Sequence, residues 1–431
     1  MIKLLRLLKL GFLLLRVSRC KDVTISMSKQ VADCVFSCGA VAIKFSQWYA
    51  ARYEINSSDN QNLCKILQGS FENCPEHSLS YTEKIFKKSF GKSMYSLLDV
   101  NPKPIASGSV GQVYEATKRD TGDSVIIKVK HPKLLKDFNS TKFFIKILSF
   151  FFRIKIDLSD FLRDIEGQFN YENEAKNLQL VYELYEGDEM IVIPRLISFS
   201  SDVIIMTKED GISYNDIVDE KIREKASTGL MAFQRQNLSV HGIVHGDLHV
   251  GNWKIRQSDD DFKIIVYDFG LLNFVDPVVM QRWMKAYQYE DYNTLVKIVL
   301  KNKNESELDE FVLDKIIEHC DEVIKSNHSM HKLLKTIIPL MRKNNLTIDE
   351  HFVSVIISFS LTEQIFRNGT VVHDDDEESG RNYLSSAMDI VAFCDAKNTC
   401  SSLKTLLSNE IDEMDYIEPK DIGIDLNTFY A

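Results

Sequence analysis

Two short segments decide how this chain folds, His245-Gly-Asp-Leu-His-Val-Gly-Asn252 and Ile264-Ile-Val-Tyr-Asp-Phe-Gly270. Asp247 and Asn252 are five residues apart in a predicted loop, and Asp268 directly follows an apolar strand. Phosphoryl transfer between oxygens requires a group near the acceptor hydroxyl and oxygen ligands for magnesium at the phosphates. The pattern therefore predicts a phosphotransfer site in which Asp247 is the base and Asn252 and Asp268 bind the metal.

Two more residues complete the set that this chemistry needs. A turn at Arg119–Gly122 followed by the β-branched run Ser124–Val129 predicts a β-hairpin, and Lys128 on its second strand fits the lysine that holds the α- and β-phosphates. Glu174 lies on a later predicted helix among apolar neighbours, where a buried carboxylate needs a cationic partner. We therefore predict an ion pair between Lys128 and Glu174. A DFG tripeptide alone is a weak signal, but the two motifs in this order are a strong one.

A run of small residues precedes the hairpin. The segment Pro104–Val113 does not match G-x-G-x-x-G, yet its small side chains would let backbone amides approach a phosphate. The small residues are Ala106, Ser107, Gly108 and Ser109.

Composition sets the outer limits. With 431 residues, 44% apolar and 26% charged, the chain is long enough for a two-lobed domain with a full core. A net charge of -10 argues against a nucleic-acid binder, which needs clustered Lys and Arg. The eight cysteines form no CxxC pair, so we expect neither a structural zinc site nor a disulfide framework.

The first 21 residues interleave Lys and Arg with leucines and contain no acidic residue. A signal peptide would separate its charges from a continuous apolar core, so this pattern predicts an amphipathic basic helix. The helix is either a mitochondrial presequence or a membrane-surface segment, or else an ordinary surface helix of the fold. No later stretch is long and apolar enough for a transmembrane helix, and the nearest candidate, Phe143–Ile156, is interrupted by Lys and Arg.

Periodicity gives a coarse map of the rest. Residues 27–55 read as one helix with an apolar stripe, and its other face carries Lys44 and Gln47, which periodicity alone assigns to solvent. The remaining expectations are helices and loops over 56–100, a basic helix over 133–156, a helix from Asp157 or Ser159 that runs through Glu174 to Val181, strands at Val203–Met206 and Ile264–Val266, and helices after about 280 apart from an acidic loop at 374–378.

The chain resembles the UbiB/ADCK (aarF-domain) family of atypical kinases over roughly residues 30–290. The resemblance rests on Lys44-Phe-Ser-Gln47, Gln112-Val113, Glu174-Ala-Lys-Asn177 and the segment from His245 to Asn252. It implies an α+β, bilobal protein-kinase-like fold with an N-terminal helical extension and a mostly helical C-lobe. The implied divisions are 1–26 for the basic segment, 27–100 for the extension, 101–210 for the N-lobe and 211–431 for the C-lobe.

The resemblance also implies ligands and the residues that hold them. ATP or ADP with Mg²⁺ is expected, and the extension's K-x-G-Q motif folds over the nucleotide cleft in this family. The implied nucleotide-binding residues are Ala106, Ser107, Gly108, Ser109, Val113, Lys128, Met206, Lys44 and Gln47. Two motifs depart from the family pattern, because Ser46 replaces the glycine and Gln168-Phe-Asn170 replaces E-x-D. Lys44 would therefore meet Gln168 through a hydrogen bond instead of an ion pair.

The implied function is a Mg-dependent kinase or ATPase that supports ubiquinone or isoprenoid-lipid metabolism at a membrane, with a hydrophobic lipid or quinone precursor as partner. The basic N-terminus favours a mitochondrial location. One alternative is a small-molecule phosphotransferase of the aminoglycoside or choline kinase type, which shares the HxDxxxxN loop. Another is a nucleotide-gated scaffold without catalysis, which the altered KFSQ and QFN motifs leave open.

Overall fold

The computed structural model divides the chain into two compact units. It describes residues 2–18, 20, 23–39, 41–44, 46, 66, 74–140, 142, 165–258, 261–276, 279–280, 282–283, 286, 291–302, 310–326, 341, 343–344, 346–348, 352, 355, 358, 362 and 365. Unit 1 comprises Met1–Glu183, Pro194–Glu209 and Asp268–Leu271, and unit 2 comprises Leu184–Ile193, Asp210–Tyr267 and Leu272–Ala431.

Unit 1 is built on a six-stranded sheet in the order β1-β3-β4-β7-β6, with β2 paired to β3. The predicted hairpin is confirmed, because β3 and β4 pair antiparallel with Val113 opposite Lys128. The predicted strand at Val203–Met206 is confirmed as β7, which pairs with β4. The strands are β1 (Leu98–Val100), β2 (Ala106–Ser107), β3 (Gly111–Lys118), β4 (Ser124–Lys130), β6 (Leu196–Phe199) and β7 (Val203–Thr207).

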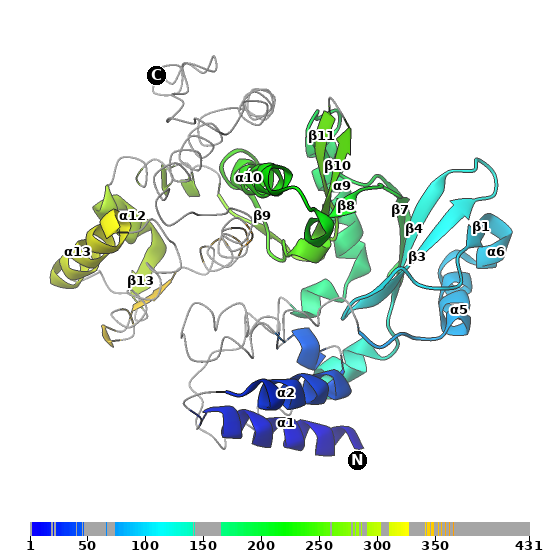
Figure 1. The fold of residues 1–431 in the computed structure, drawn as a ribbon, viewed down its shortest axis with the longest axis horizontal. Helices are drawn as coiled ribbons and strands as arrows, with labels where there is room; N and C mark the ends of the chain where they lie inside the picture. The colour runs from blue at the N-terminus through cyan, green and yellow to red at the C-terminus, as the bar shows by residue number, and fades with distance from the viewer. Residues whose placement is uncertain are drawn as a thin grey trace. The chain divides into compact units, whose positions relative to one another are not determined.

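Side chains along β4 alternate between the buried core and the face of the sheet that carries Lys128. Val125, Ile127 and Val129 are fully buried and share a cluster with Phe86 of helix α5 (Leu79–Phe90), which lies near this sheet in Figure 1. Because successive side chains of a strand point to opposite faces, Lys128 lies on the other face. The short helix α6 (Met94–Leu97) leads directly into β1.

Helices α1 (Ile2–Ser18) and α2 (Ile25–Cys38) pack side by side (Figure 1) around one apolar cluster. The prediction of a single helix over 27–55 was wrong at Gly39, whose φ of 94° ends α2. Residues 41–44 and 46 are helical again, and the amide of Ala42 donates to the Gly39 carbonyl. A glycine adopts this backbone conformation without steric cost, which is why the helix breaks there.

Helix α9 (Tyr171–Tyr185) carries Glu174 and begins later than the sequence suggested. The predicted continuous helix was wrong at Phe169–Asn170, where a turn separates residues 165–168 from α9. The side chain of Asn170 accepts a hydrogen bond from the Glu172 amide at 3.1 Å, as a helix N-cap does. The predicted start at Asp157 or Ser159 and most of the predicted helix over 133–156 lie outside the described residues; residues 134–140 and 142 are helical.

Unit 2 holds a four-stranded sheet in the order β5-β11-β10-β8 and a two-stranded sheet of β9 and β12. The predicted strand at Ile264–Val266 is confirmed within the longer β11. Its elements are β5 (Ile191–Val192), β8 (Ile212–Ser213), η2 (Tyr214–Asp216), α10 (Glu220–Gln236), η3 (Asn237–His241), β9 (Ile243–His245), η4 (Val250–Asn252), β10 (Trp253–Ser258), β11 (Asp261–Val266) and β12 (Leu272–Phe274).

The expectation that everything after about 280 is helical, apart from the acidic loop, was wrong. Besides α12 (Tyr292–Val299) and α13 (Glu310–Ser326), strands β13 (Leu300–Asn302) and β14 (Leu346–Ile348) pair antiparallel. Leu300 pairs with Ile348 and Asn302 with Leu346, and the side chains of Leu300 and Leu346 are both buried. Residues 374–378 lie outside the described part of the chain. None of the described helices combines the length and hydropathy that a membrane crossing requires.

Candidate phosphotransfer site

Lys128 stands at the centre of a buried cluster in unit 1. Its Nζ donates to Glu174 Oε1 at 2.6 Å and to Asp268 Oδ2 at 3.0 Å. The predicted ion pair between Lys128 and Glu174 is therefore present, and both residues are buried. The side chain of Asp268 is 39% exposed, so of these three groups it is the one that a ligand reaches most readily.

Burial and charge act against each other in this cluster. Burial opposes the charge on Lys128, but Asp268 and Glu174 outweigh it and raise the pKa of the ammonium well above its ordinary value. Burial would also raise the pKa of Asp268, yet Lys128 and Lys44 hold it well below its ordinary range. For Glu174, burial prevails over the opposing charge of Lys128 and raises the pKa to about 7. At neutral pH the cluster therefore presents an ionised, accessible Asp268.

The backbone around Asp268 is held in an unusual conformation. Asp268 has a φ of 66°, which costs free energy for a residue with a side chain. Its Oδ1 accepts from the Gly270 amide at 3.3 Å, and the Phe269 carbonyl accepts from Asn177 of α9 at 2.9 Å. A β-carbon on Gly270 would lie 3.2 Å from Asp268 Oδ1, so the glycine allows this close approach.

Tyr171 belongs to the cluster, and the motif argument did not assign it a role. Lys128 Nζ lies 5.4 Å from the centre of its fully buried ring. The space that a β-carbon on Gly111 would take is filled by the Tyr171 hydroxyl. The available signal was the shared helical face of Tyr171 and Glu174, three residues apart. Glycine at position 111 thus lets strand β3 pass over the tyrosine.

Lys44 lies close enough to this cluster to act on it. Beside the larger effects of burial and Lys128, its charge lowers the pKa of both Glu174 and Asp268. Periodicity alone predicted that Lys44 faces solvent. The side chain is instead half-buried. The hydroxyl of Ser46, which stands where the family has glycine, donates to the Ile43 carbonyl at 2.7 Å. Pairing of Lys44 with Gln168 stays a prediction, and Gln47 lies outside the described residues.

The small-residue loop begins in β2, which holds Ala106 and Ser107, and continues through Gly108 and Ser109 towards β3. Ala106 pairs with Val113 and Ser107 with Gln112, and the Gly108 amide donates to the Gly111 carbonyl at 3.0 Å. Met206, the remaining residue expected at the nucleotide, is buried on β7 opposite Ile126. The nucleotide-binding roles of these residues stay predictions.

In unit 2 the segment from His245 to Asn252 forms a tightly bonded loop. Asn252 Nδ2 donates to the Asp247 carbonyl at 2.7 Å, and the His249 amide donates to the same carbonyl at 2.9 Å. The Asp247 amide donates to His245 Nδ1 at 3.3 Å, while the His245 carbonyl accepts from Ser358 at 2.5 Å. The loop therefore holds Asp247 and Asn252 in a fixed relation to each other.

Each of the two predicted metal ligands carries an oxygen of the kind that magnesium binds. Asp268 offers an ionised carboxylate, and Asn252 commits its amide nitrogen to Asp247, which leaves the amide oxygen as its possible metal ligand. Mg²⁺ takes such oxygens, commonly one or two from the protein, and fills its other positions with phosphate and water. Asp268 lies in unit 1 and Asn252 in unit 2, each has a chemistry that suits the metal, and their shared role as ligands stays a prediction.

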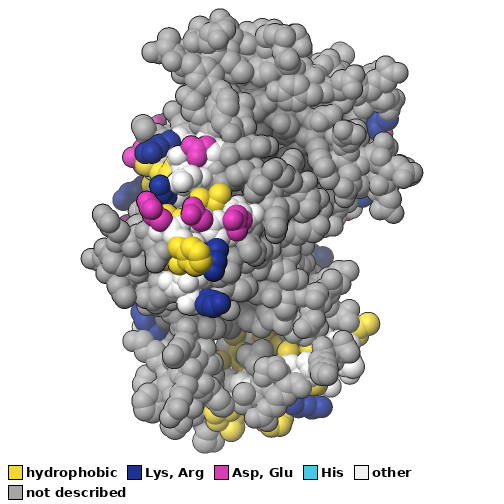
Figure 2. Space-filling model, turned by 90° about the vertical axis from the view of Figure 1, so that its left-hand side faces the viewer, with side chains coloured by type: hydrophobic (Ala, Val, Ile, Leu, Met, Phe, Trp, Pro, Cys, Tyr) yellow, Lys and Arg dark blue, Asp and Glu magenta, His cyan; other side chains and the backbone are white. Residues whose placement is uncertain are grey.

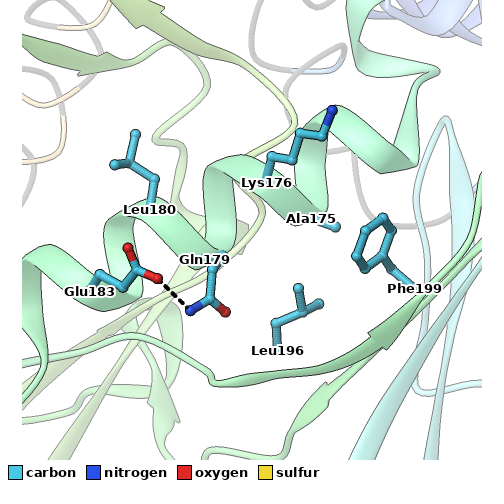
Figure 3. A pocket seen from close by; sticks show the side chains of 7 residues that line it. All are labelled: Ala175, Lys176, Gln179, Leu180, Glu183, Leu196 and Phe199. Atoms are coloured by element: carbon cyan, nitrogen blue, oxygen red, sulfur yellow. Dashed lines mark hydrogen bonds between the residues drawn. The ribbon is translucent and has the colours of Figure 1, made fainter.

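A separate hollow lies on the flank of α9 (Figure 3). Its volume is about 270 Å³, below the range usual for ligand sites, so it is too small for a nucleotide. Gln179 donates to Glu183 at 2.8 Å along its edge. The lining residues are Ala175, Lys176, Gln179, Leu180, Glu183, Leu196 and Phe199.

Comparison with known proteins identifies the family of this chain. The model of the ABC1 atypical kinase-like domain matches residues 70–299, more than half of the chain. "Probable serine/threonine-protein kinase abkC" of Dictyostelium discoideum is 30% identical over 244 residues, 53% of this chain and 35% of that protein. "Probable protein kinase UbiB" of Marinobacter nauticus is 24% identical over 350 residues, 73% of this chain and 62% of that protein.

A solved structure shares the fold. The complex of Rv3197 with erythromycin from Mycobacterium tuberculosis superposes with a TM-score of 0.51 at 18% identity, covering 68% of this chain and 80% of that one. The chain spans 35%, 39% and 46% of the lengths of three curated relatives. The matched domain and the α+β protein-kinase-like fold agree with the motifs, and the chain belongs to the ABC1 atypical kinase-like family, whose members include UbiB and the aarF-domain kinases.

Proposed function

We propose that this protein binds ATP or ADP together with magnesium and acts as an atypical kinase or ATPase. The observation that carries the proposal is Lys128, which is shared between Glu174 at 2.6 Å and Asp268 at 3.0 Å. In protein kinases the equivalent lysine binds the α- and β-phosphates while its glutamate partner holds it in place. An ionised Asp268 beside that lysine matches the role of a metal-binding carboxylate.

Each residue has a distinct task in this proposal. Lys128 binds phosphate oxygens, Asp268 and Asn252 supply oxygen ligands to the metal, and Asp247 takes the proton of the acceptor hydroxyl or water. Glu174 keeps Lys128 in place and protonated. Magnesium, when bound, neutralises the negative charge that develops on the phosphate oxygens.

Thermal unfolding with ATP or ADP, with and without magnesium, tests the proposal. A ligand at about 100 times its dissociation constant adds about 2.7 kcal/mol to the free energy of unfolding. We expect a magnesium-dependent rise in Tm for the wild type, its loss in Asp268→Asn, and the wild-type rise in the control Asp99→Asn, an exposed residue of β1. No rise with either nucleotide in the wild type would refute nucleotide binding and favour a scaffold role.

We also propose that helix α1 docks on an anionic lipid surface. Leu7, Leu10, Leu13 and Val17 are buried against α2, yet Leu5, Leu8 and Phe12 are 60%, 51% and 63% exposed on another face. Lys9 and Arg16 of the same helix are also exposed. In Figure 2, hydrophobic and Lys or Arg side chains lie together at the lower end of the face, where Figure 1 places α1 and α2. An exposed apolar strip with basic residues beside it suits the interface of an anionic membrane.

Sedimentation with vesicles tests this docking. The triple variant Leu5→Ser, Leu8→Ser, Phe12→Ser should lose binding to vesicles that contain anionic lipid. Phe311→Ser on α13, a matched change of an exposed aromatic residue (67% exposed), should leave binding unchanged. Equal binding of the triple variant and the wild type would refute a membrane role of α1.

The lipid partner that we propose is a quinone precursor or another isoprenoid lipid, and the proposed location is a mitochondrial membrane. The support is membership of the family to which UbiB belongs, together with the basic amphipathic α1. Nucleotide hydrolysis with vesicles that contain such a lipid should exceed hydrolysis with the same vesicles lacking it. Equal rates would refute this choice of partner.

A further inference from the structure

Two histidines outside the phosphotransfer motifs are joined ring to ring in unit 1. His77 precedes α5 and His131 follows β4, and their Nδ1 atoms are 2.7 Å apart. The rings meet edge to face, with centroids 4.9 Å apart and planes at 87°. A bond between two imidazole nitrogens requires one hydrogen between them, so one ring donates and the other accepts.

The far side of His131 decides which ring donates. His131 Nε2 lies 3.0 Å from the carbonyl oxygen of Gly108, which can only accept, so Nε2 carries the hydrogen. A neutral His131 must then accept at Nδ1, and His77 must donate from its own Nδ1. His77 Nε2 is left as an acceptor for the Thr82 hydroxyl, 2.9 Å away.

The chain of hydrogen bonds continues into the sheet. The Thr82 hydroxyl lies 3.0 Å from the hydroxyl of the buried Tyr114, which receives a hydrogen bond from Gln112 Nε2 at 2.5 Å. Every donor in this chain of hydrogen bonds then points the same way. The order is Gln112, Tyr114, Thr82, His77, His131 and finally the Gly108 carbonyl. Burial keeps both histidines neutral, as the order requires, because it lowers the pKa of His77 to about 4 and also that of His131.

The chain of bonds ends on the small-residue loop. The backbone amide of His131 also donates to the Val110 carbonyl at 2.9 Å, and the amide of His77 donates to Gln112 Oε1 at 2.8 Å. His131 thereby holds the loop at two carbonyls, those of Gly108 and Val110, while His77 is tied to strand β3. In a trans peptide the N–H points opposite to the C=O, so fixing the Gly108 carbonyl on His131 directs the Ser109 amide N–H the other way.

We propose that His77 and His131 are positioning residues that orient the Ser109 amide to bind a phosphate of the nucleotide. The inference rests on the proposed function, because the phosphate is that of the bound ATP or ADP. A backbone N–H held in advance loses no conformational freedom when the phosphate arrives, which favours tight binding. Neither histidine reaches the reacting atoms in this proposal.

Two substitutions of His131 separate the ends of the chain of bonds. His131→Gln keeps a donor where Nε2 bonds Gly108, whereas His131→Asn keeps only an acceptor near Nδ1. We expect His131→Asn to weaken ADP and ATP binding about tenfold, the usual effect of losing one hydrogen bond to a charged group, while His131→Gln stays within about threefold. Adenosine, which has no phosphate, should bind both variants and the wild type equally in calorimetric titrations.

Nitrogen-15 NMR of histidine-labelled protein reports the order directly, without nucleotide. We expect the Nδ1–H form for His77 and the Nε2–H form for His131, and Thr82→Val should leave both forms unchanged, because the Gly108 carbonyl fixes His131 and His131 fixes His77. The opposite forms in the wild type would overturn the proposal even if a His131 variant failed to fold. Wild type that binds no nucleotide refutes the proposed function, whereas normal binding by wild type and His131→Asn alike refutes only the positioning role.

Discussion

The hydroxyl of Tyr171 occupies the space that a β-carbon on Gly111 would need. We therefore predict that Gly111→Ala lowers the free energy of unfolding by about 1–3 kcal/mol, the usual cost of overpacking. Urea unfolding measures the effect. Gly167→Ala is the control, because nothing lies within 4 Å of its added carbon.

The double variant Gly111→Ala, Tyr171→Phe identifies the cause. Removing the hydroxyl should recover part of the loss and not all of it, because the Val129 carbonyl would still lie 2.8 Å from the new carbon. A double variant as unstable as the sum of both single variants would show that the hydroxyl is not the obstacle.

The left-handed backbone at Asp268 makes a prediction that is independent of its charge. Asp268→Ala and Asp268→Gly both remove the carboxylate, but only glycine adopts a φ of 66° without strain. The glycine variant should be more stable than the alanine variant by about 1 kcal/mol. At Asp99 on strand β1 the same pair of substitutions should show the reverse order, since glycine weakens a strand.

Glu174 should make stability fall as pH rises. Its pKa is about 7 in the folded protein against an ordinary value of 4.5, so the folded state binds more protons between these values. This contribution is fully present below pH 4.5 and is lost as pH rises through 7. The difference in free energy of unfolding between wild type and Glu174→Gln, measured over this range, isolates it. A difference that does not vary with pH would contradict the raised pKa.

His77 should make the stability of the folded protein fall as pH falls. Burial lowers its pKa from 6.5 to about 4, so the unfolded state binds more protons between these values. The stability that depends on the neutral ring is complete above pH 6.5 and declines as pH falls towards 4. His77→Asn should remove this part of the acid sensitivity in thermal unfolding. Equal acid sensitivity of the two proteins would rule the effect out.

The sequence predicted the parts of the site that motifs and strong periodicity define. Lys128 and Glu174 are 46 residues apart, and they were paired by the kinase pattern of a strand lysine and a helix glutamate together with the rule that a buried carboxylate needs a cation. The fold class followed from the resemblance to the UbiB/ADCK family, and the matching domain model agrees with it.

What the sequence did not predict depends on single residues or distant contacts. Gly39 and Asn170 each end or begin a helix through local geometry, which the apolar stripes running past them do not record. His77 and His131 belong to no motif and are 54 residues apart, so only the packing of α5 on the sheet brings their rings together. The pairing of β13 with β14 joins Leu300 to a segment more than forty residues later, beyond the range of any local pattern.

Helix α1 contributes to the apolar core of unit 1 as well as offering a candidate membrane contact. Its inner stripe of Leu7, Leu10, Leu13 and Val17 closes the core that α2 forms with Val31, Val35 and Cys38. A targeting segment can be removed only if the folded protein does not need it. Removal of α1 would expose the core that it shares with α2. Docking through α1 would therefore place the apolar core that it shares with α2 directly at the lipid surface.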